Sequence, residues 1–159
     1  MLVPVTISRL LIREMADSQF VTLQEIEGSR CFPIAIGLSE AFAIERRMNG
    51  TVPPRPQTHD LLDSVLSSMG AKLVRIEIHD LDAGTFHARL VLEHEGRSIA
   101  VDSRPSDALA LGVASDTPVF VEDAVIEEAG SVASNSDGVG PSESPGFDED
   151  LDEDDSEFQ

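Results

Sequence analysis

The feature that most constrains this fold is a short apolar strand that turns directly into a helix, across residues 98–112. Pro105 must lie in the first turn of that helix, because proline has no N–H to donate and its φ is already helical. Asp102 or Ser103 is expected to cap the free N–H groups, and Asp107 complements the positive helix end. The sequence therefore predicts a strand–turn–helix unit whose helix begins at the proline.

The same pattern occurs earlier in the chain, at residues 32–44. There, Ile-Ala-Ile is followed by a break and by Ser-Glu-Ala-Phe-Ala-Ile. The later segment has Ile-Ala-Val, a break, and Ser-Asp-Ala-Leu-Ala-Leu, with the extra pair Arg104-Pro105. The match predicts an internal duplication of one strand–helix unit. Chance similarity between two strand–helix junctions is the alternative.

Hydrophobic periodicity and turn signals predict the remaining elements. Strands are expected at residues 3–12, 20–25, 30–36, 73–79, 85–94 and 97–101, helices at 38–48, 58–69 and 105–114, a short strand at 119–120 and a helical turn at 122–128. Thr58 is the expected N-cap of the second helix. Tight turns between successive strands favour antiparallel pairing. We therefore expect an α+β fold, a mainly antiparallel sheet with helices packed on it.

Charge divides the chain into two parts. The whole sequence has 30 acidic and 11 basic residues, a net charge of −19. Ten acidic residues and no basic one lie in residues 130–159, which leaves a net charge of −9 for residues 1–129. A segment rich in Ser, Gly, Asp and Glu buries too little to offset the entropy of ordering it. We expect one folded domain over residues 1–129 and a disordered acidic tail over residues 130–159.

Signals of secretion and of membrane insertion are missing from the sequence. Cys31 is the one cysteine, so an intramolecular disulfide framework is excluded, and we expect it to be a small buried apolar residue. Unlike a signal peptide, the start of the chain has no basic segment ahead of an apolar run, and Arg9 and Arg13 interrupt its apolar residues. No run approaches about 18 apolar residues. We expect a cytoplasmic protein without a membrane span.

Two segments, residues 55–60 and 104–107, place an Arg-Pro pair just ahead of a helix start that carries a hydroxyl and a carboxylate. A helix N-terminus offers unpaired N–H donors and partial positive charge, and an arginine beside it adds a bidentate fork for phosphate. Two such ends, brought together by a duplicated fold, would form a cradle for a phosphodiester. The alternative assigns Thr58 and Ser103 to capping and leaves Arg104 to pair with an aspartate in the core.

His59 is the histidine best placed for chemistry, because it adjoins Asp60 at a helix start after a proline-rich loop. It could act as a general base or as a metal ligand. A solvated histidine in the first helical turn is the alternative. The other histidines lie on predicted strands without metal-ligand spacing. The sequence has no glycine-rich phosphate loop, CxxC pair, HExxH motif or nucleophile elbow.

Three segments carry a family resemblance: Phe32-Pro33-Ile34-Ala35-Ile36-Gly37 followed by Glu40-Ala41, then Arg55-Pro56-Gln57-Thr58-His59-Asp60-Leu61-Leu62, then Asp102-Ser103-Arg104-Pro105-Ser106-Asp107-Ala108-Leu109-Ala110-Leu111. In this order they resemble the bifunctional nuclease family, small bacterial and plant proteins credited with DNase and RNase activity. The resemblance covers residues 1–129. It implies an oligomeric α+β domain that hydrolyses phosphodiesters in DNA and RNA with little sugar specificity. It also implies that a divalent cation, Mg²⁺ or Mn²⁺, assists the cleavage and that no organic cofactor is used.

The catalytic roles are hypotheses at this point. The expected catalytic residues are His59, Asp60, Arg104 and Asp107, and the expected substrate-binding residues are Arg55, Thr58 and Ser106. In this hypothesis the arginines neutralise the phosphate, while His59 with either aspartate activates water, directly or through the metal ion. Asp60 and Asp107 are the candidate metal ligands.

The charge of the domain argues for a second class of function. Nucleic-acid affinity comes largely from neutralised phosphates, and residues 1–129 have a net charge of −9 without a basic cluster. The alternative is a non-catalytic regulatory or scaffolding module. Such a module would bind an anionic ligand or a partner protein at the same helix starts.

Overall fold

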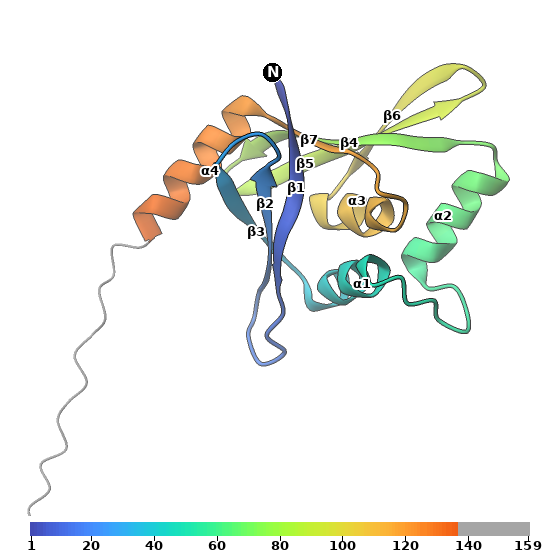
Figure 1. Cartoon of the computed structure of the whole chain (residues 1–159), viewed down its shortest axis with the longest axis horizontal. Helices are drawn as coiled ribbons and strands as arrows, with labels where there is room; N and C mark the ends of the chain where they lie inside the picture. Colours follow the sequence, from blue (N-terminus) through green and yellow to red (C-terminus); the bar gives the residue numbers. More distant parts are fainter. Residues whose placement is uncertain (137–159) are drawn as a thin grey trace, which may run out of the picture.

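The computed structural model describes the backbone of residues 1–136 and the side chains of residues 1–130 (Figure 1). The strands are β1 (Leu2–Leu11), β2 (Gln19–Glu25), β3 (Cys31–Ile36), β4 (Lys72–Asp82), β5 (Thr85–His94), β6 (Arg97–Ser103) and β7 (Val119–Glu122). The helices are α1 (Leu38–Met48), α2 (Thr58–Ser68), α3 (Pro105–Gly112) and α4 (Asp123–Ser136), and a single 3-10 turn covers Val113–Ser115. Among these residues no helix is both long and apolar enough to cross a membrane.

The strands form one sheet in the order β3-β2-β1-β7-β4-β5-β6. Neighbouring strands are antiparallel, except that β7 pairs with β4 in parallel. This arrangement confirms the predicted α+β class with a mainly antiparallel sheet. Two three-stranded meanders, each followed by a helix, flank β7, and the duplication of the strand–helix unit stays a prediction.

The sheet curls, so that strands far apart in its order come close in space. Phe32 of β3 stacks on Phe86 of β5, with ring centroids 5.7 Å apart. Four strands separate β3 from β5 in the sheet. The larger of two apolar clusters among the described residues joins residues of β1 to β5 and β7 with residues of α1, α3 and α4, and a smaller one joins β4 and β5 with α3. The curl brings the edge strand β3 towards the beginning of α3.

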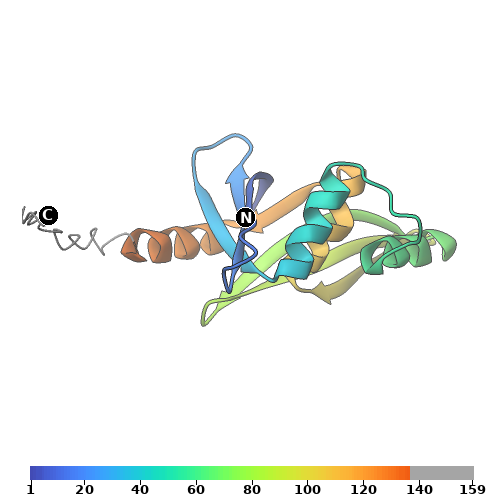
Figure 2. The ribbon, with the colours of Figure 1, turned by 90° about the horizontal axis from the view of Figure 1, so that it is seen from below.

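Helix α3 is the central helix of the fold. All of its residues except Asp107 are buried, from Pro105 to Gly112. It packs against α1, α2, β4 and β5, whereas α4 packs on β3, β4 and β7. Figures 1 and 2 show α4 and α2 at opposite ends of the molecule. The helix of the strand–turn–helix unit predicted from the sequence is thus the one that α1, α2 and the sheet surround.

Both predicted helix caps are wrong. Gln57, not Thr58, is the N-cap of α2: its side chain and that of Asp60 form a capping box. Arg104 is the N-cap of α3 and makes no side-chain cap, while the Ser103 hydroxyl donates to the Arg104 carbonyl oxygen at 2.9 Å. The residue before a proline is held in an extended conformation, so Pro105 at the first helical position makes its predecessor the cap residue.

Two further expectations need correction. Cys31 is exposed, because residues alternate between the two faces of β3 and this one points away from the core. Helix α4 continues past Gly130 as far as Ser136, so the predicted tail begins inside a helix. Residues 137–159 of that tail lie outside the described residues.

The tight packing of α3 predicts that Gly112→Ala destabilises the protein. A Cβ atom at Gly112 would lie 2.6 Å from Cδ1 of the fully buried Ile76 and 3.1 Å from Cβ of Thr117. We expect this overpacking to outweigh the better helix propensity of alanine and to cost about 1–3 kcal/mol of unfolding free energy. Urea unfolding followed by circular dichroism measures the change.

Gly130→Ala is the matched control, because a Cβ atom there meets no heavy atom within 4 Å. The urea concentration at the midpoint of unfolding should equal that of wild type or lie slightly above it. An unfolding midpoint for Gly112→Ala equal to that of the control would show that α3 is not closely packed against β4.

Candidate functional site

An aspartate at the start of α3 joins a histidine to an arginine. Oδ1 of Asp107 lies 3.0 Å from Nε2 of His59, at the start of α2. Its other oxygen, Oδ2, accepts a hydrogen bond of 2.6 Å from Nε of Arg104. The two oxygens of one carboxylate therefore fix the relative positions of an imidazole and a guanidinium.

The same arginine also reaches α1. Nη2 of Arg104 donates to Oε1 of Glu40 at 3.0 Å, so the starts of α1, α2 and α3 all contribute to one group of side chains. We call Glu40, His59, Arg104 and Asp107 the helix-start cluster. The Arg104 side chain is 65% exposed, whereas that of His59 is 13% exposed. The cluster therefore presents a guanidinium to solvent above a mostly buried imidazole.

The charges of the cluster reinforce one another. Burial raises the pKa of the Asp107 carboxyl, but hydrogen bonds from Arg104 and His59 more than offset this, so its pKa lies below the ordinary value of 3.8. Hydrogen bonds to Asp107 and Glu40 raise the pKa of the Arg104 guanidinium. At neutral pH Asp107 is an ionised acceptor and Arg104 a charged donor.

Asp60 belongs to a different group of side chains. Its carboxylate accepts hydrogen bonds from Nη2 of Arg46 at 2.9 Å, from Nη1 of Arg47, and from the Gln57 backbone N–H at 3.0 Å. Burial raises the pKa of Asp60, but the three donors together lower it by more, so the pKa lies below its ordinary value of 3.8. The structure does not bring this carboxylate into the helix-start cluster.

Arg47 explains why a carboxylate is needed at this place. Its side chain is only 5% exposed, and its Nε and Nη2 donate to the carbonyl oxygens of Ala110 and Leu111 at 2.6 and 3.1 Å. Those carbonyls lie near the end of α3. Arg47 and Asp60 therefore link α1, α2 and α3, and fix α2 in the place where His59 meets Asp107.

The three predicted substrate contacts lie in different surroundings. Arg55 is exposed in the proline-rich connector and makes no hydrogen bond or ion pair with any described residue, and Thr58 is exposed at the start of α2. Ser106 is only 6% exposed, yet its hydroxyl makes no hydrogen bond within the described part of the chain. Of the three, only Ser106 is a near neighbour of Arg104 and Asp107 in the chain.

The divalent metal centre that the sequence suggested stays a prediction. No group of three or more His, Cys, Asp or Glu side chains that could hold a metal ion occurs among residues 1–130. The two candidate ligands, Asp60 and Asp107, lie in separate groups, and each is bound by arginine. We therefore derive no step through a metal ion from this arrangement.

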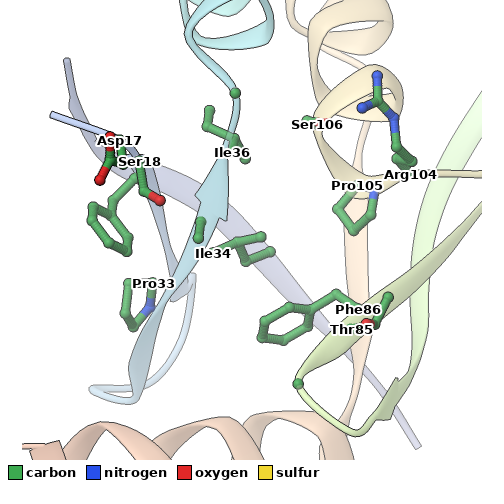
Figure 3. A pocket seen from close by; sticks show the side chains of 14 residues that line it. Asp17, Ser18, Pro33, Ile34, Ile36, Thr85, Phe86, Arg104, Pro105 and Ser106 are labelled. Carbon is green, nitrogen blue, oxygen red and sulfur yellow. The ribbon is translucent and has the colours of Figure 1, made fainter. Parts of the chain in front are cut away.

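A pocket of about 600 Å³ lies beside the cluster. Its walls are β3, the turn between β4 and β5, and the start of α3 (Figure 3). Arg104, Pro105 and Ser106 line it, whereas His59 and Asp107 do not. Arg104 thus lies between the pocket and the His59–Asp107 pair.

The sequence did not single out Glu40, Arg46 or Arg47. Glu40 could have been found from the repeat, because Ser39-Glu40-Ala41 matches Ser106-Asp107-Ala108 and puts Glu40 at the position of Asp107. Nothing in the sequence distinguishes Arg46 and Arg47 from ordinary solvated arginines near a helix end. Their role depends on α2 and α3, which are distant in sequence.

These observations define an α+β protein with a His–Asp–Arg site at converging helix starts. The family model for the bifunctional nuclease domain matches residues 21–134. The chain belongs to the bifunctional nuclease domain family, and the resemblance stated from the sequence is confirmed.

Two relatives come from Mycobacterium tuberculosis. They are the uncharacterized protein Rv1829 of strain H37Rv and the uncharacterized protein MT1877 of strain CDC 1551. Each is 40% identical to this chain over 119 residues, which cover 75% of the chain and 71% of the relative. Their names assign no activity, so the functional argument must come from the site itself.

The buried position of Arg47 predicts that Asp60→Asn destabilises the fold. An amide retains an acceptor but removes the charge that compensates the guanidinium, so we expect a loss of about 2–4 kcal/mol in unfolding free energy. The lowered pKa of Asp60 means that only its ionised form stabilises the fold. The difference in unfolding free energy between variant and wild type should therefore be constant between about pH 5 and 7, and should shrink as the pH falls below 3.8 and Asp60 becomes protonated.

Asp63→Asn provides the control, since Asp63 is 50% exposed and lies 3.4 Å from the same arginine. We expect less than about 1 kcal/mol there. Denaturant unfolding over a pH series measures both variants. Equal losses for the two would show that Asp60 is no more important to the fold than a surface carboxylate.

Proposed function

We propose that the chain is a nuclease that hydrolyses phosphodiester bonds in DNA and RNA with little sugar specificity. The observation that carries the proposal is the contact of one carboxylate, Asp107, with both His59 and Arg104. Family membership supports the reaction class. The helix-start cluster supplies a proton acceptor and a phosphate-binding cation side by side.

The hydrogen bond to Asp107 decides which nitrogen of His59 can accept a proton. An ionised carboxylate only accepts hydrogen bonds, so the proton between the two groups belongs to Nε2 of His59. In the neutral imidazole, Nδ1 then carries the lone pair. Nδ1 would take a proton from the attacking water as its oxygen bonds to phosphorus, and Asp107 would stabilise the imidazolium that forms.

Arg104 would hold the phosphate during this step. Its guanidinium is the most exposed group of the cluster, and a bidentate contact with two phosphate oxygens would stabilise the charge that develops on them. The phosphate would share the arginine with Asp107 and Glu40. As the bond to the leaving oxygen breaks, that oxygen takes up a proton, and the imidazolium of His59 is the nearest donor that the proposal provides.

The other predicted residues have supporting roles in this proposal. Ser106 would donate its hydroxyl to the phosphate, while Arg55 and Thr58 would contact the nucleic acid beyond the scissile bond. Asp60 is a positioning residue, because it acts on His59 through the placement of α2. We further propose that cleavage depends on Mg²⁺ or Mn²⁺ and that the protein acts in the cytoplasm.

A second candidate function is a non-catalytic module that binds an anionic ligand or a partner protein at the helix starts. One observation favours it. Arg104 is already paired with two carboxylates, and the whole chain has a net charge of −19, so little positive potential is available to attract a polyanion. Ligand binding without turnover would select this candidate.

Cleavage of labelled single- and double-stranded DNA and RNA tests the nuclease directly. We expect Arg104→Ala and His59→Gln each to lower kcat/KM by about 100-fold or more, because each removes a group used in the transition state. Reactions with Mg²⁺, Mn²⁺ or EDTA determine whether a divalent cation is needed.

Arg97→Ala is the matched control, an exposed arginine on β6 without a partner among the described residues. It should cleave at the wild-type rate. Equal residual cleavage by wild type and Arg104→Ala would identify a contaminant and contradict the proposal.

Self-association is also part of the proposal. Helix α2 has no fully buried residue, and four apolar side chains on it or just beyond its end are exposed: Leu61, Leu62, Val65 and Met69. An uncovered apolar face of this kind favours association with a second copy of the chain. We expect Val65→Glu to lower the molecular mass measured by light scattering from that of an oligomer to that of a monomer.

Met15→Glu is the control for this experiment, because Met15 is fully exposed in a turn far from α2 in sequence. It should leave the mass unchanged. A monomeric wild type, or an oligomer that Val65→Glu does not dissociate, would contradict an interface on α2.

A further inference from the structure

The pocket beside the helix-start cluster has a predominantly apolar interior. Phe20, Pro33, Ile34 and Phe86 line it, and Figure 3 shows Phe86 opposite Ile34, with Pro105 closing the side towards α3. Phe86 is held in place by its stacking on the buried Phe32. On the side of β3 that faces α3, the pocket therefore offers the rings of Phe86 and Pro105, which suit a flat ring.

The end of the pocket next to α3 is polar. Arg104 lines it, and so does Ser106, a buried residue whose hydroxyl has no hydrogen-bond partner among the described residues. The first turn of α3 adds backbone N–H groups, because the first intrahelical bond there is that from Ala108 to the Arg104 carbonyl oxygen. A hydroxyl that is open to the pocket and has no partner among the described residues, beside free N–H groups, is suited to an anionic oxygen.

The opposite rim has a different polarity. Asp17 and Ser18 lie there, across β3 from Arg104 (Figure 3), and a carboxylate at this rim would repel a second phosphate. Arg104 is the only Lys or Arg among the lining residues. The complementary ligand therefore has one anionic group, a flat and largely apolar body, and hydrogen-bonding groups at its far end.

We infer that this pocket binds the base and sugar of one nucleotide, whose phosphate lies at the start of α3 beside Arg104 and Ser106. The inference rests on the proposed function, because it makes the pocket the subsite next to the scissile phosphate. A volume of about 600 Å³ is within the range of small-molecule sites. Stacking of the base on Phe86 would allow binding of both DNA and RNA without selection by the sugar.

Titration calorimetry with small probes separates the base from the phosphate. The probes are adenosine 5′-monophosphate, adenosine 3′-monophosphate and ribose 5-phosphate. For wild type we expect at least one of the adenosine monophosphates to bind about 10-fold more tightly than ribose 5-phosphate, the difference that stacking of one base supplies. Arg104→Ala should weaken all the probes that bind.

Ala35→Phe narrows the pocket without removing a core residue, because Ala35 is exposed on the edge strand β3, lies opposite Phe20 of β2 and lines the cavity. It should weaken the adenosine monophosphates about 10-fold and leave ribose 5-phosphate unchanged. Ala100→Phe is the matched control, the same change at an exposed position of the other edge strand, β6. It should bind as wild type. If Ala35→Phe does not fold, Phe20→Leu replaces it.

Each result has one meaning. Equal affinity for adenosine monophosphates and ribose 5-phosphate, no binding of any probe, or wild-type affinity in Ala35→Phe would overturn the base pocket, even if the nuclease assay succeeds. Nucleotide binding that Ala35→Phe weakens, in a protein that cleaves no nucleic acid, would support the pocket and refute the nuclease.

Discussion

The burial of α3 is the constraint on which the rest of the structure depends. The sheet and two helices cover this short helix. Its small residues allow β4 to approach closely: a Cβ atom added at Gly112 would lie only 2.6 Å from Cδ1 of Ile76. Close packing on several sides resists a shift of the helix along its axis. Its first turn is therefore a fixed platform that holds Arg104, Ser106 and Asp107 in defined positions.

Helices α1 and α2 are attached to α3 by polar contacts near the C-terminal end of α3. Arg47 donates to carbonyl oxygens of α3 and to Asp60 of α2. A buried guanidinium must have its charge compensated, so these bonds specify how α1 and α2 lie relative to α3. The contacts of Glu40 and His59 with the start of α3 result from that arrangement. Helix α2 thus takes part in two groups of side chains: Asp60 pairs with Arg47 and fixes the helices, whereas His59 contacts Asp107 in the candidate site.

The sequence predicted the features that local patterns determine. The first helix was expected at residues 38–48 and is α1, and the strand–helix unit around Pro105 is β6 and α3. The adjacent residues His59 and Asp60 have different partners: His59 contacts Asp107 of α3, and Asp60 contacts the arginines of α1. This difference could not be predicted, because it depends on which helix each side chain faces. The Phe32–Phe86 stacking, and with it the pocket, depends on the curl of the whole sheet. Contacts between distant segments leave no periodic signal in the sequence.

The central claim is that His59 and Asp107 act as one unit in phosphodiester cleavage. A double-mutant cycle in kcat/KM, with His59→Gln, Asp107→Asn and the combined variant, measures this most directly. The account predicts strong non-additivity: each single change costs nearly as much as both together, because Asp107 acts through His59. Losses that multiply, or single variants that retain wild-type cleavage, would contradict it.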